Sequence, residues 1–375
     1  MSTTNELLRT GLHDWHASNS GRMVEFAGWS MPVQYTSIID EHNATRSSIG
    51  LFDVSHMGRF FFEGESPEVI SQFLDRLTTR RVANMEVGRI RYSLMTNESG
   101  GILDDILVYH LPKSGGGSQI MMVVNASNRA KIAEWIESNS KDGDNIKLVD
   151  KTTQTAMIAC QGPNANGLVA ELSEVDPAGL KYYTGAASKV CGADAIVSRT
   201  GYTGEDGCEI IVDNDHATEI WEELHSRSIA IRGSACGLAS RDTLRLEAAM
   251  PLYGHELGED VNAAQTGLGF AMNFTDRKFV GRSAILAARK DEALLRRVGI
   301  ELEGRRAARQ GCSILVADQP VGEITSGTFS PTMQKPISMG YIQPQYAEPG
   351  TDLIVDIRGS SHPGRIVKLP FYERG

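Results

Sequence analysis

The chain lacks any apolar run long enough to cross a membrane. No stretch reaches the roughly 18 consecutive apolar residues that a bilayer-spanning helix needs. The N-terminal segment, MSTTNELLRTGLHDW, carries an acidic residue early and has no hydrophobic core, so a secretory signal is not expected either. The sequence thus predicts no membrane partner.

Cysteine is scarce as well. The five cysteines are widely spaced and never form a CxxC pair; they are Cys160, Cys191, Cys208, Cys236 and Cys312. This odd number and this spacing fit neither a disulfide framework nor a zinc site. A reducing compartment is therefore expected, namely the cytoplasm, or the mitochondrial matrix if the chain is a processed eukaryotic form.

Basic residues are outnumbered, with 37 Lys and Arg against 47 Asp and Glu and a net charge of −10. This balance argues against nucleic acid as the main partner. The chain also has no Walker A sequence, HExxH, GxSxG or DxDxDG loop. The segment TGYTGEDG (200–207) is not GxGxxG and lies between predicted strands, so no nucleotide or metal site is expected.

The composition is otherwise that of a globular protein, with 41% hydrophobic and 22% charged residues, and 375 residues allow two or three domains. Spacing and caps predict helices over 36–49 with Ser37 as N-cap, over 66–78 with Ser66 as N-cap, over 128–139, and over 238–250 with Ser240 as N-cap. From about residue 290, short strands alternate with Gly- and Pro-rich turns. This pattern predicts a small barrel or sandwich of about 85 residues.

Three strands are predicted over 89–97, 102–111 and 119–127, the last two joined by the glycine-rich turn KSGGGS (113–118). If Leu111 faces Gln119 in an antiparallel pair, Asp105 faces Asn125, because paired numbers sum to a constant. Directly opposed residues point to the same face of a sheet. Two polar side chains are therefore expected side by side at the ends of apolar strands.

Asp104 and Asp105 are adjacent in a predicted strand and so should point to opposite faces, which argues against a paired-carboxylate site. Either both lie at a strand end in solvent, or one of them faces a pocket. His56, in DVSHM, is a lone histidine, and we expect it to be structural rather than a ligand.

Two further charged residues have open alternatives. Glu209 should share a strand face with Ile211, where a half-buried carboxylate needs either an Arg or a ligand with adjacent N–H groups. Arg241, in the first turn of a predicted helix with Arg245 one turn on, needs an anion. That anion is either a protein acid, such as Asp242 or Glu247, or a ligand carboxylate.

Eight ordered blocks resemble the T-protein (aminomethyltransferase) family of the glycine cleavage system. The resemblance extends from near Leu12 to Tyr372, which is essentially the whole chain. The blocks are FAGWSMPVQY (26–35), GLFDVSHMG (50–58), GGILDDILVY (100–109), QGPNA (161–165), SRTGYTGEDGCEI (198–210), SRDTLRLEAAMPLYGHE (240–256), GEITSGTFSPT (322–332) and KLPFY (368–372).

The resemblance implies an α+β fold, a three-domain cloverleaf in which two interleaved α+β domains (1–289) precede a C-terminal β-barrel (290–375). It implies transfer of the aminomethyl carbon from the lipoyl arm of H-protein to tetrahydrofolate. The products would be 5,10-methylenetetrahydrofolate, ammonia and dihydrolipoyl H-protein. Tetrahydrofolate would be the acceptor substrate, and no metal is implied.

The family's site residues map onto this sequence by the same resemblance. The catalytic carboxylate matches Asp105, and the substrate- and folate-binding residues match Met57, Tyr92, Asn125, Tyr182, Tyr202, Glu209 and Arg241. Two departures stand out. The family commonly has GLGARD where this chain has GLASRD (237–242), and the family's late folate-contacting residue has Arg374 only as its nearest counterpart.

Two other activities share features with this resemblance. One is a tetrahydrofolate-dependent demethylase of another small substrate; the related sarcosine- and dimethylglycine-oxidising enzymes carry an FAD-binding half that is absent here. The other is a folate-binding accessory protein of iron–sulfur maintenance, whose Lys-Gly-Cys-Tyr signature is replaced here by RTGY (199–202).

Overall fold

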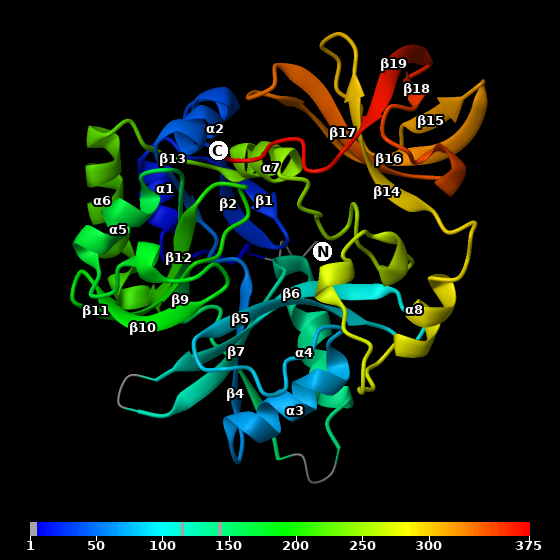
Figure 1. Cartoon of the computed structure of the whole chain (residues 1–375). Coiled ribbons are helices and arrows are strands. Elements are labelled where there is room, and N and C mark those ends of the chain that lie inside the picture. The colour runs from blue at the N-terminus through cyan, green and yellow to red at the C-terminus, as the bar shows by residue number, and fades with distance from the viewer. Residues whose placement is uncertain (1–5, 114–115, 142–144) are drawn as a thin grey trace, which may run out of the picture.

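The computed structural model describes residues 6–113, 116–141 and 145–375. Three lobes surround the middle of the molecule (Figure 1), which confirms the predicted α+β cloverleaf with a C-terminal barrel. Residues 114–115, in the predicted glycine-rich turn, lie outside the described residues. The position of the boundary between residues 289 and 290 stays a prediction.

The first lobe is built on a five-stranded sheet with the order β5-β6-β7-β4-β8. Its strands are β4 (Gly58–Glu63), β5 (Arg89–Thr96), β6 (Ile102–Pro112), β7 (Ser118–Val124) and β8 (Lys147–Asp150). Helices α3 (Pro67–Leu77) and α4 (Arg129–Ser138) supply side chains to one core with this sheet. Ser66 caps α3 by accepting from the Val69 N–H, as predicted.

The second lobe is built on a six-stranded sheet with the order β10-β11-β12-β9-β3-β13. Its strands are β3 (Gly50–Asp53), β9 (Thr155–Gln161), β10 (Gly185–Val190), β11 (Ala193–Ser198), β12 (Gly207–Asp213) and β13 (Ser234–Ala235). Helices α5 (Ala165–Leu172) and α6 (Asn214–Ala230) pack against it. All strands of the first lobe lie between β3 and β9 in sequence, so the two domains are interleaved.

The two sheets share a third hydrophobic core. It contains Phe52 of β3, Tyr109 and Leu111 of β6, Met157 of β9 and Ile211 of β12, all of them buried. Side chains alternate along a strand, so each sheet offers one face to its own helices and the other to its partner sheet. The face between the sheets is where the cavity described below opens.

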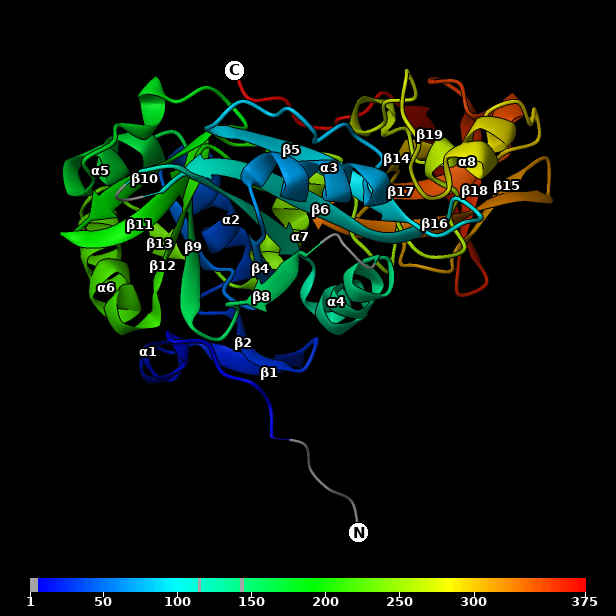
Figure 2. The same ribbon diagram turned by 90° about the horizontal axis from the view of Figure 1, so that it is seen from below.

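A hairpin and the helices α1, α2, α7 and α8 complete the interleaved region. The hairpin β1 (Arg22–Phe26) and β2 (Trp29–Gln34) lies with α1 (His13–Ser18) on one side of the body (Figure 2). Ser37 caps α2 (Ile38–Ser47), as predicted. α8 (Arg282–Ala288) precedes the barrel, and the short 3₁₀ helices are η1 (Ala126–Asn128), η2 (Pro177–Gly179), η3 (Ala263–Gln265), η4 (Gly269–Ala271) and η5 (Pro344–Tyr346).

Helix α7 (Leu238–Glu247) begins differently from the prediction. Its N-cap is Gly237, and the predicted cap Ser240 lies inside the helix. A Cβ at Gly237 would come within 2.3 Å of the Val33 backbone, so only glycine fits this approach to β2. Glu41 of α2 accepts from both the Gly237 N–H and the Ser240 hydroxyl. A distant carboxylate thus satisfies the helix start that Ser240 was expected to cap.

The third lobe is a closed barrel with the order β14-β17-β16-β15-β18-β19. Its strands are β14 (Arg296–Leu302), β15 (Ser313–Val316), β16 (Gln319–Ser330), β17 (Lys335–Ile342), β18 (Asp352–Ile357) and β19 (Ser360–Val367). Alternate side chains fill the interior. Ile337 and Met339 of β17 instead pack against Leu246 and Ala249 at the end of α7.

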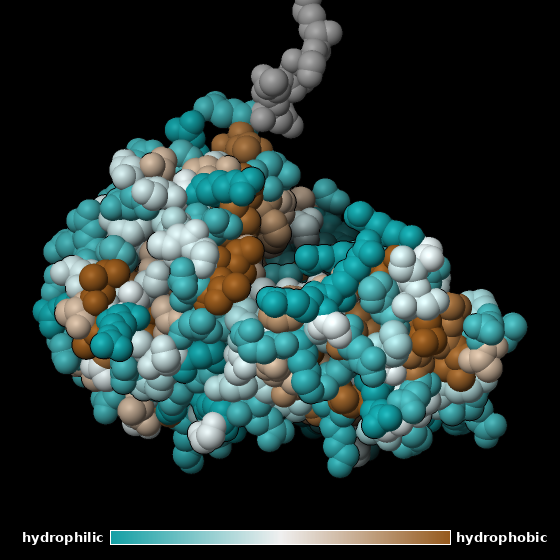
Figure 3. Space-filling model, turned by 90° about the horizontal axis from the view of Figure 1, so that it is seen from above, coloured by the Kyte–Doolittle hydropathy of each residue, from teal (hydrophilic) through white to brown (hydrophobic). Residues whose placement is uncertain are grey.

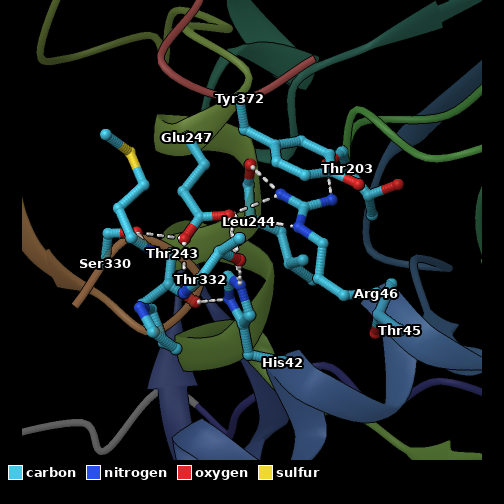
Figure 4. A network of polar contacts seen from close by, with 12 residues as sticks. His42, Thr45, Arg46, Thr203, Thr243, Leu244, Glu247, Ser330, Thr332 and Tyr372 are labelled. Atoms are coloured by element: carbon cyan, nitrogen blue, oxygen red, sulfur yellow. Dashed lines mark hydrogen bonds and ion pairs between the residues drawn. The ribbon is translucent and has the colours of Figure 1, made fainter. Parts of the chain in front are cut away.

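A buried carboxylate, Glu247, joins the barrel to the rest of the protein (Figure 4). It lies 2.8 Å from the Arg46 guanidinium and 3.2 Å from His42 Nε2, both of α2. It also accepts from the Ser330 hydroxyl and from the Thr332 N–H and hydroxyl, where β16 ends. Burial raises the pKa of Glu247, but its partners, led by His42, outweigh burial and lower it to about 2.

The surface seen from above is mostly hydrophilic, with hydrophobic residues in separate groups (Figure 3). No helix within the described ranges is both long and apolar enough to cross a membrane. In the same residues, no group of three or more His, Cys, Asp or Glu side chains is arranged to hold a metal ion.

We expect Glu247→Gln to lower the free energy of unfolding at pH 7 by about 3 kcal/mol or more, because the largely buried guanidinium of Arg46 would lose its counter-charge. The difference in free energy of unfolding between the natural chain and the variant should become smaller as the pH falls. It should decrease from about pH 4.3, the usual pKa of an unfolded Glu, toward about pH 2, the pKa of Glu247 in the folded protein. Urea unfolding across this pH range measures both effects. The exposed control Glu219→Gln should change stability by no more than about 0.5 kcal/mol; equal losses in the two variants would contradict this role.

Candidate functional site

A cavity of about 670 Å³ opens where the two sheets meet α7 and the N-terminal hairpin. Strands β6, β7, β9 and β12 contribute to its wall, as do α7 and the loops that carry residues 26–27, 56–57, 200–202, 250–255 and 268–270. Charged and polar side chains project into a mainly apolar lining, a composition typical of small-molecule sites. Six of the seven predicted binding residues, together with Asp105, line this one cavity.

The β6–β7 register is the one predicted. Leu111 pairs with Gln119, and the ladder continues to Leu107 opposite Val123. Asn125 follows the end of β7, and its side-chain amide Nδ2 donates to Asp105 Oδ1 at 2.8 Å. The prediction that Asp105 and Asn125 lie side by side, made from the constant sum of paired residue numbers, is therefore confirmed. The hydrogen-bonded pairing of the two strands nevertheless stops just before these residues.

Asp105 presents its carboxylate to the cavity. It accepts from Asn125 and, at 3.1 Å, from the Tyr92 hydroxyl of the neighbouring strand β5. In the described part of the chain no Lys, Arg or His forms an ion pair with Asp105. Burial raises the pKa of this carboxyl group above its ordinary value, against the lowering effect of its two donors.

Asp104 lies on the opposite face of β6, fully buried. It does not line the cavity, so only one of the two acids faces it, as expected. The two acids are nevertheless linked through Asn125. Asn125 Nδ2 also donates to Asp104 Oδ1 at 2.8 Å. Because Asn125 lies beyond the strand end, its amide reaches the carboxylates of both faces.

Glu209 of β12 is 5% exposed and reaches the cavity from the second sheet. Its neighbours Ile210 and Val212 point into the helix-covered core, as the alternation predicted. Its donor within the described residues is the Thr200 hydroxyl, not the Arg that sequence alone allowed. Burial raises the pKa of Glu209 despite Thr200 and the charge of Arg241.

The two arginines of α7 differ in their partners. Arg245 donates to Asp242 at 2.8 Å and to buried Glu256 at 3.0 Å, which is the salt-bridge alternative. Arg241 forms no ion pair in the described chain, and its Nη1 is buried without a hydrogen-bond partner. Its guanidinium lies 4.8 Å from the centroid of the Tyr202 ring and faces the same cavity. Arg241 is therefore free to meet an anion.

The remaining predicted residues are placed less uniformly. Met57 and Tyr202 line the cavity, and the Tyr202 hydroxyl donates to the Pro251 carbonyl at 2.5 Å. Tyr182 does not line it: its side chain is exposed, and the adjacent Tyr183 occupies the wall instead. Tyr183 is held there by backbone hydrogen bonds to Ile90 and Arg199. Arg374 also lies outside the lining residues, 3.3 Å from Asp206.

Sequence reasoning overlooked several residues of the wall. His56 is buried, with its ring edge against Phe26 and its Nδ1 unpartnered in the described chain. Burial lowers its pKa to about 4, so the ring is neutral. Phe270, 60% exposed, stacks on Tyr92. Neither His56, a lone histidine in an apolar block, nor Phe270 gives a sequence signal that marks it as part of the cavity wall.

Together these groups favour a particular ligand chemistry. Two carboxylates without basic partners at hydrogen-bond distance, Asp105 and Glu209, suit N–H groups or developing positive charge. Aromatic rings from Tyr92, Tyr202 and Tyr183 suit a flat ring system. The free Arg241 suits an anionic end.

Comparison with known families gives two matches. The family model described as "GCVT N-terminal domain" matches residues 12–276. The model described as "Glycine cleavage T-protein C-terminal barrel domain" matches residues 296–373. The two matches together account for most of the chain.

Individual relatives are similar over their full length. The aminomethyltransferase of Streptomyces coelicolor is 41% identical over 381 aligned positions, covering 100% of both chains. That of Halothermothrix orenii is 40% identical, covering 97% of this chain and 99% of its own. The crystal structure of glycine cleavage system aminomethyltransferase T from Bartonella henselae matches with a TM-score of 0.89 and 30% identity, covering 98% of each chain.

We expect Arg241→Met to leave the thermal stability of the ligand-free protein unchanged or raise it, because the substitution removes a buried charge that has no partner. Arg245→Met, one turn away, should lower the free energy of unfolding by about 3–5 kcal/mol, because it leaves the buried carboxylate of Glu256 without its ion-pair partner. Thermal unfolding of both variants without ligand makes the comparison. An equal loss in the two would show that Arg241 has a structural partner.

Proposed function

Because the chain belongs to the T-protein (aminomethyltransferase) family of the glycine cleavage system, we propose that its central cavity is the site of aminomethyl transfer. The donor is the aminomethylated lipoyl arm of H-protein, and the acceptor is tetrahydrofolate. The products are 5,10-methylenetetrahydrofolate, ammonia and dihydrolipoyl H-protein.

One observation supports this assignment most directly. A single cavity brings Asp105, with its donors Asn125 and Tyr92, together with Glu209 and the unpaired Arg241. These groups suit the three chemical parts of a folate: reactive ring nitrogens, a pterin edge with adjacent N–H groups, and an anionic glutamate.

The chemistry requires bonds to one carbon to be exchanged. The aminomethyl carbon is bonded to the lipoyl sulfur and to an amine nitrogen, and in the product it bridges N5 and N10 of the folate. One bond to N5 and one to N10 form, and the C–S and C–N bonds break. The protons of N5–H and N10–H end on the sulfur and on the leaving ammonia, so atoms and charge balance without an oxidant or reductant.

Asp105 is the catalytic residue of this proposal. As the carbon changes partners it passes through an iminium-like state that carries positive charge, and a fixed carboxylate lowers the energy of that state. Asn125 and Tyr92 hold the carboxylate from two sides, so it needs no rearrangement when the charge develops. The apolar wall keeps water from competing for the electrophilic carbon.

The other residues hold the folate in our proposal. Glu209 accepts two parallel hydrogen bonds from the 2-amino and ring N–H groups of the pterin, as a carboxylate does from any such edge. Tyr202, Met57 and Tyr183 contact the flat ring. Arg241 pairs with a carboxylate of the glutamate end. Tyr182 and Arg374 lie near the cavity rather than on its wall, so their predicted contacts would require them to move.

The decisive assay follows methylenetetrahydrofolate formation by the purified chain from aminomethylated, lipoylated H-protein and tetrahydrofolate. Transfer from other methyl donors instead would favour the demethylase alternative. Folate binding without transfer from any donor would favour the accessory-protein alternative.

In this assay we expect Asp105→Asn to lower kcat by 10²-fold or more while tetrahydrofolate binding, measured by calorimetry, stays within a few-fold, because only stabilisation of the charged carbon is lost. The exposed barrel residue Asp352 provides the control: Asp352→Asn removes the same charge far from the cavity and should leave kcat unchanged. Near-normal turnover in the Asp105 variant would rule out its catalytic role.

A further inference from the structure

Asp104 is a buried acid that the proposed chemistry does not use. Its carboxylate accepts three hydrogen bonds: from the Asn125 N–H at 3.0 Å, from Asn125 Nδ2 at 2.8 Å and from Asn128 Nδ2 at 2.6 Å. Its side chain is 0% exposed. No Lys, Arg or His in the described chain forms an ion pair with it, so nothing of opposite charge offsets the cost of burying it.

The side-chain amide of Asn125 donates to three oxygens, one of which is the Asp105 backbone carbonyl at 3.2 Å. Its Nδ2 donates to Asp104 Oδ1 and to Asp105 Oδ1, each at 2.8 Å. The NH₂ end of the amide is the end that donates to these carboxylates, so the carbonyl end faces away from them. Asn125 lines the cavity, and no donor in the described residues reaches its Oδ1. That oxygen is available to accept an N–H from a ligand.

We propose that Asp104 is a positioning residue of the transfer reaction: from behind the sheet it fixes the amide of Asn125, which in turn holds the Asp105 carboxylate and turns its own carbonyl oxygen toward the cavity. Asn125 and Asp105 then present one fixed set of acceptors to the N–H groups and positive charge of the reacting carbon. This inference rests on the proposed function, because it assigns Asp105 its catalytic task.

Asp104 and Asp105 are also coupled electrostatically. They share one amide donor inside the protein, where like charges repel strongly. Burial and the charge of Asp105 raise the pKa of Asp104, and burial raises that of Asp105. The groups facing Asp105 are the phenols Tyr92, Tyr183 and Tyr202.

Tyr253 lies close enough to Asp104 for the two groups to interact electrostatically, and its hydroxyl accepts from Lys131 at 2.7 Å. Lys131 in turn pairs with Glu259 at 2.8 Å. Lys131 thus forms its ion pair with Glu259 and not with Asp104. The pair Asp104–Asp105 therefore binds a proton more tightly than an isolated Asp would. Removing Asp104 should free the Asn125 amide, whose hydrogen bond lowers the pKa of Asp105.

The test is the pH dependence of kcat for methylenetetrahydrofolate formation in the natural chain and in Asp104→Asn. We expect the acid limb of the variant to move to higher pH, because Asp105 loses a well-placed Asn125 hydrogen bond that lowers its pKa. We also expect kcat at the optimum to fall while KM for tetrahydrofolate stays within about twofold, because the Asn125 amide loses its fixed orientation. A merely structural role for Asp104 would lower stability without moving the limb.

Asp352→Asn serves as the matched control and should leave both kcat and the limb unchanged. An unshifted limb with normal kcat in Asp104→Asn would overturn the inference. An inactive natural chain would instead count against the proposed function, so the two failures are distinguishable.

A second measurement needs no folded Asp104 variant. Carboxyl ¹³C NMR of the natural chain, labelled at Asp and with Asp105 assigned from Asp105→Asn, should show two signals that titrate together above the ordinary Asp range. Two carboxylates that stay ionised throughout, from pH 5 upward, would contradict the coupling and with it the role of Asp104.

Discussion

The register in which β6 pairs with β7 is the constraint on which the centre of this protein depends. It places Asp105 opposite Asn125, where the two strands leave the shared core and the cavity begins. A shift by one residue would carry Asp105 to the helix-covered face and bring Asp104 to the cavity. Buried Tyr109 and Leu111 on one face, and Ile106 and Val108 on the other, make such a shift costly.

Two kinds of buried charge occur in the structure, and they serve different purposes. Glu247 is surrounded by His42, Arg46 and hydroxyl donors, so its burial joins the barrel to the rest of the chain. Arg241 and Asp105 are half-buried on the cavity wall and form no ion pair in the described chain. In a protein without ligand such groups are costly, and a ligand that carries the complementary groups would offset that cost. This contrast distinguishes the site from the framework.

Much of the fold could be predicted from local patterns. Ser37 and Ser66 capped helices where their sequences indicated, and the alternation around Glu209 gave the correct face. The cap at Ser240 was mispredicted, because the carboxylate that satisfies the start of α7 belongs to Glu41, some two hundred residues away in sequence. A contact of that kind leaves no trace in the local pattern.

The sequence also predicted part of the candidate site. Pairing of residue numbers placed Asp105 beside Asn125, and strand alternation placed Asp104 on the opposite face. The hydrogen bond from Asn125 to Asp104 was not predicted, because Asn125 lies just beyond the end of the strand rather than within it. The family's blocks led to most of the cavity wall. They did not separate Tyr182 from Tyr183, since only the backbone geometry at that edge decides which ring turns inward.

The central claim is that this cavity seats the pterin on Glu209 with the reactive nitrogens beside Asp105. A crystal structure of the chain with tetrahydrofolate, or with its stable 5-methyl derivative, tests it most directly. We expect the 2-amino edge of the pterin to lie within about 2.7–3.2 Å of the Glu209 carboxylate. N5 should lie on the side of Asp105, and the glutamate end should point toward Arg241. A pterin bound in another cavity, or one whose edge faces away from Glu209 here, would contradict it.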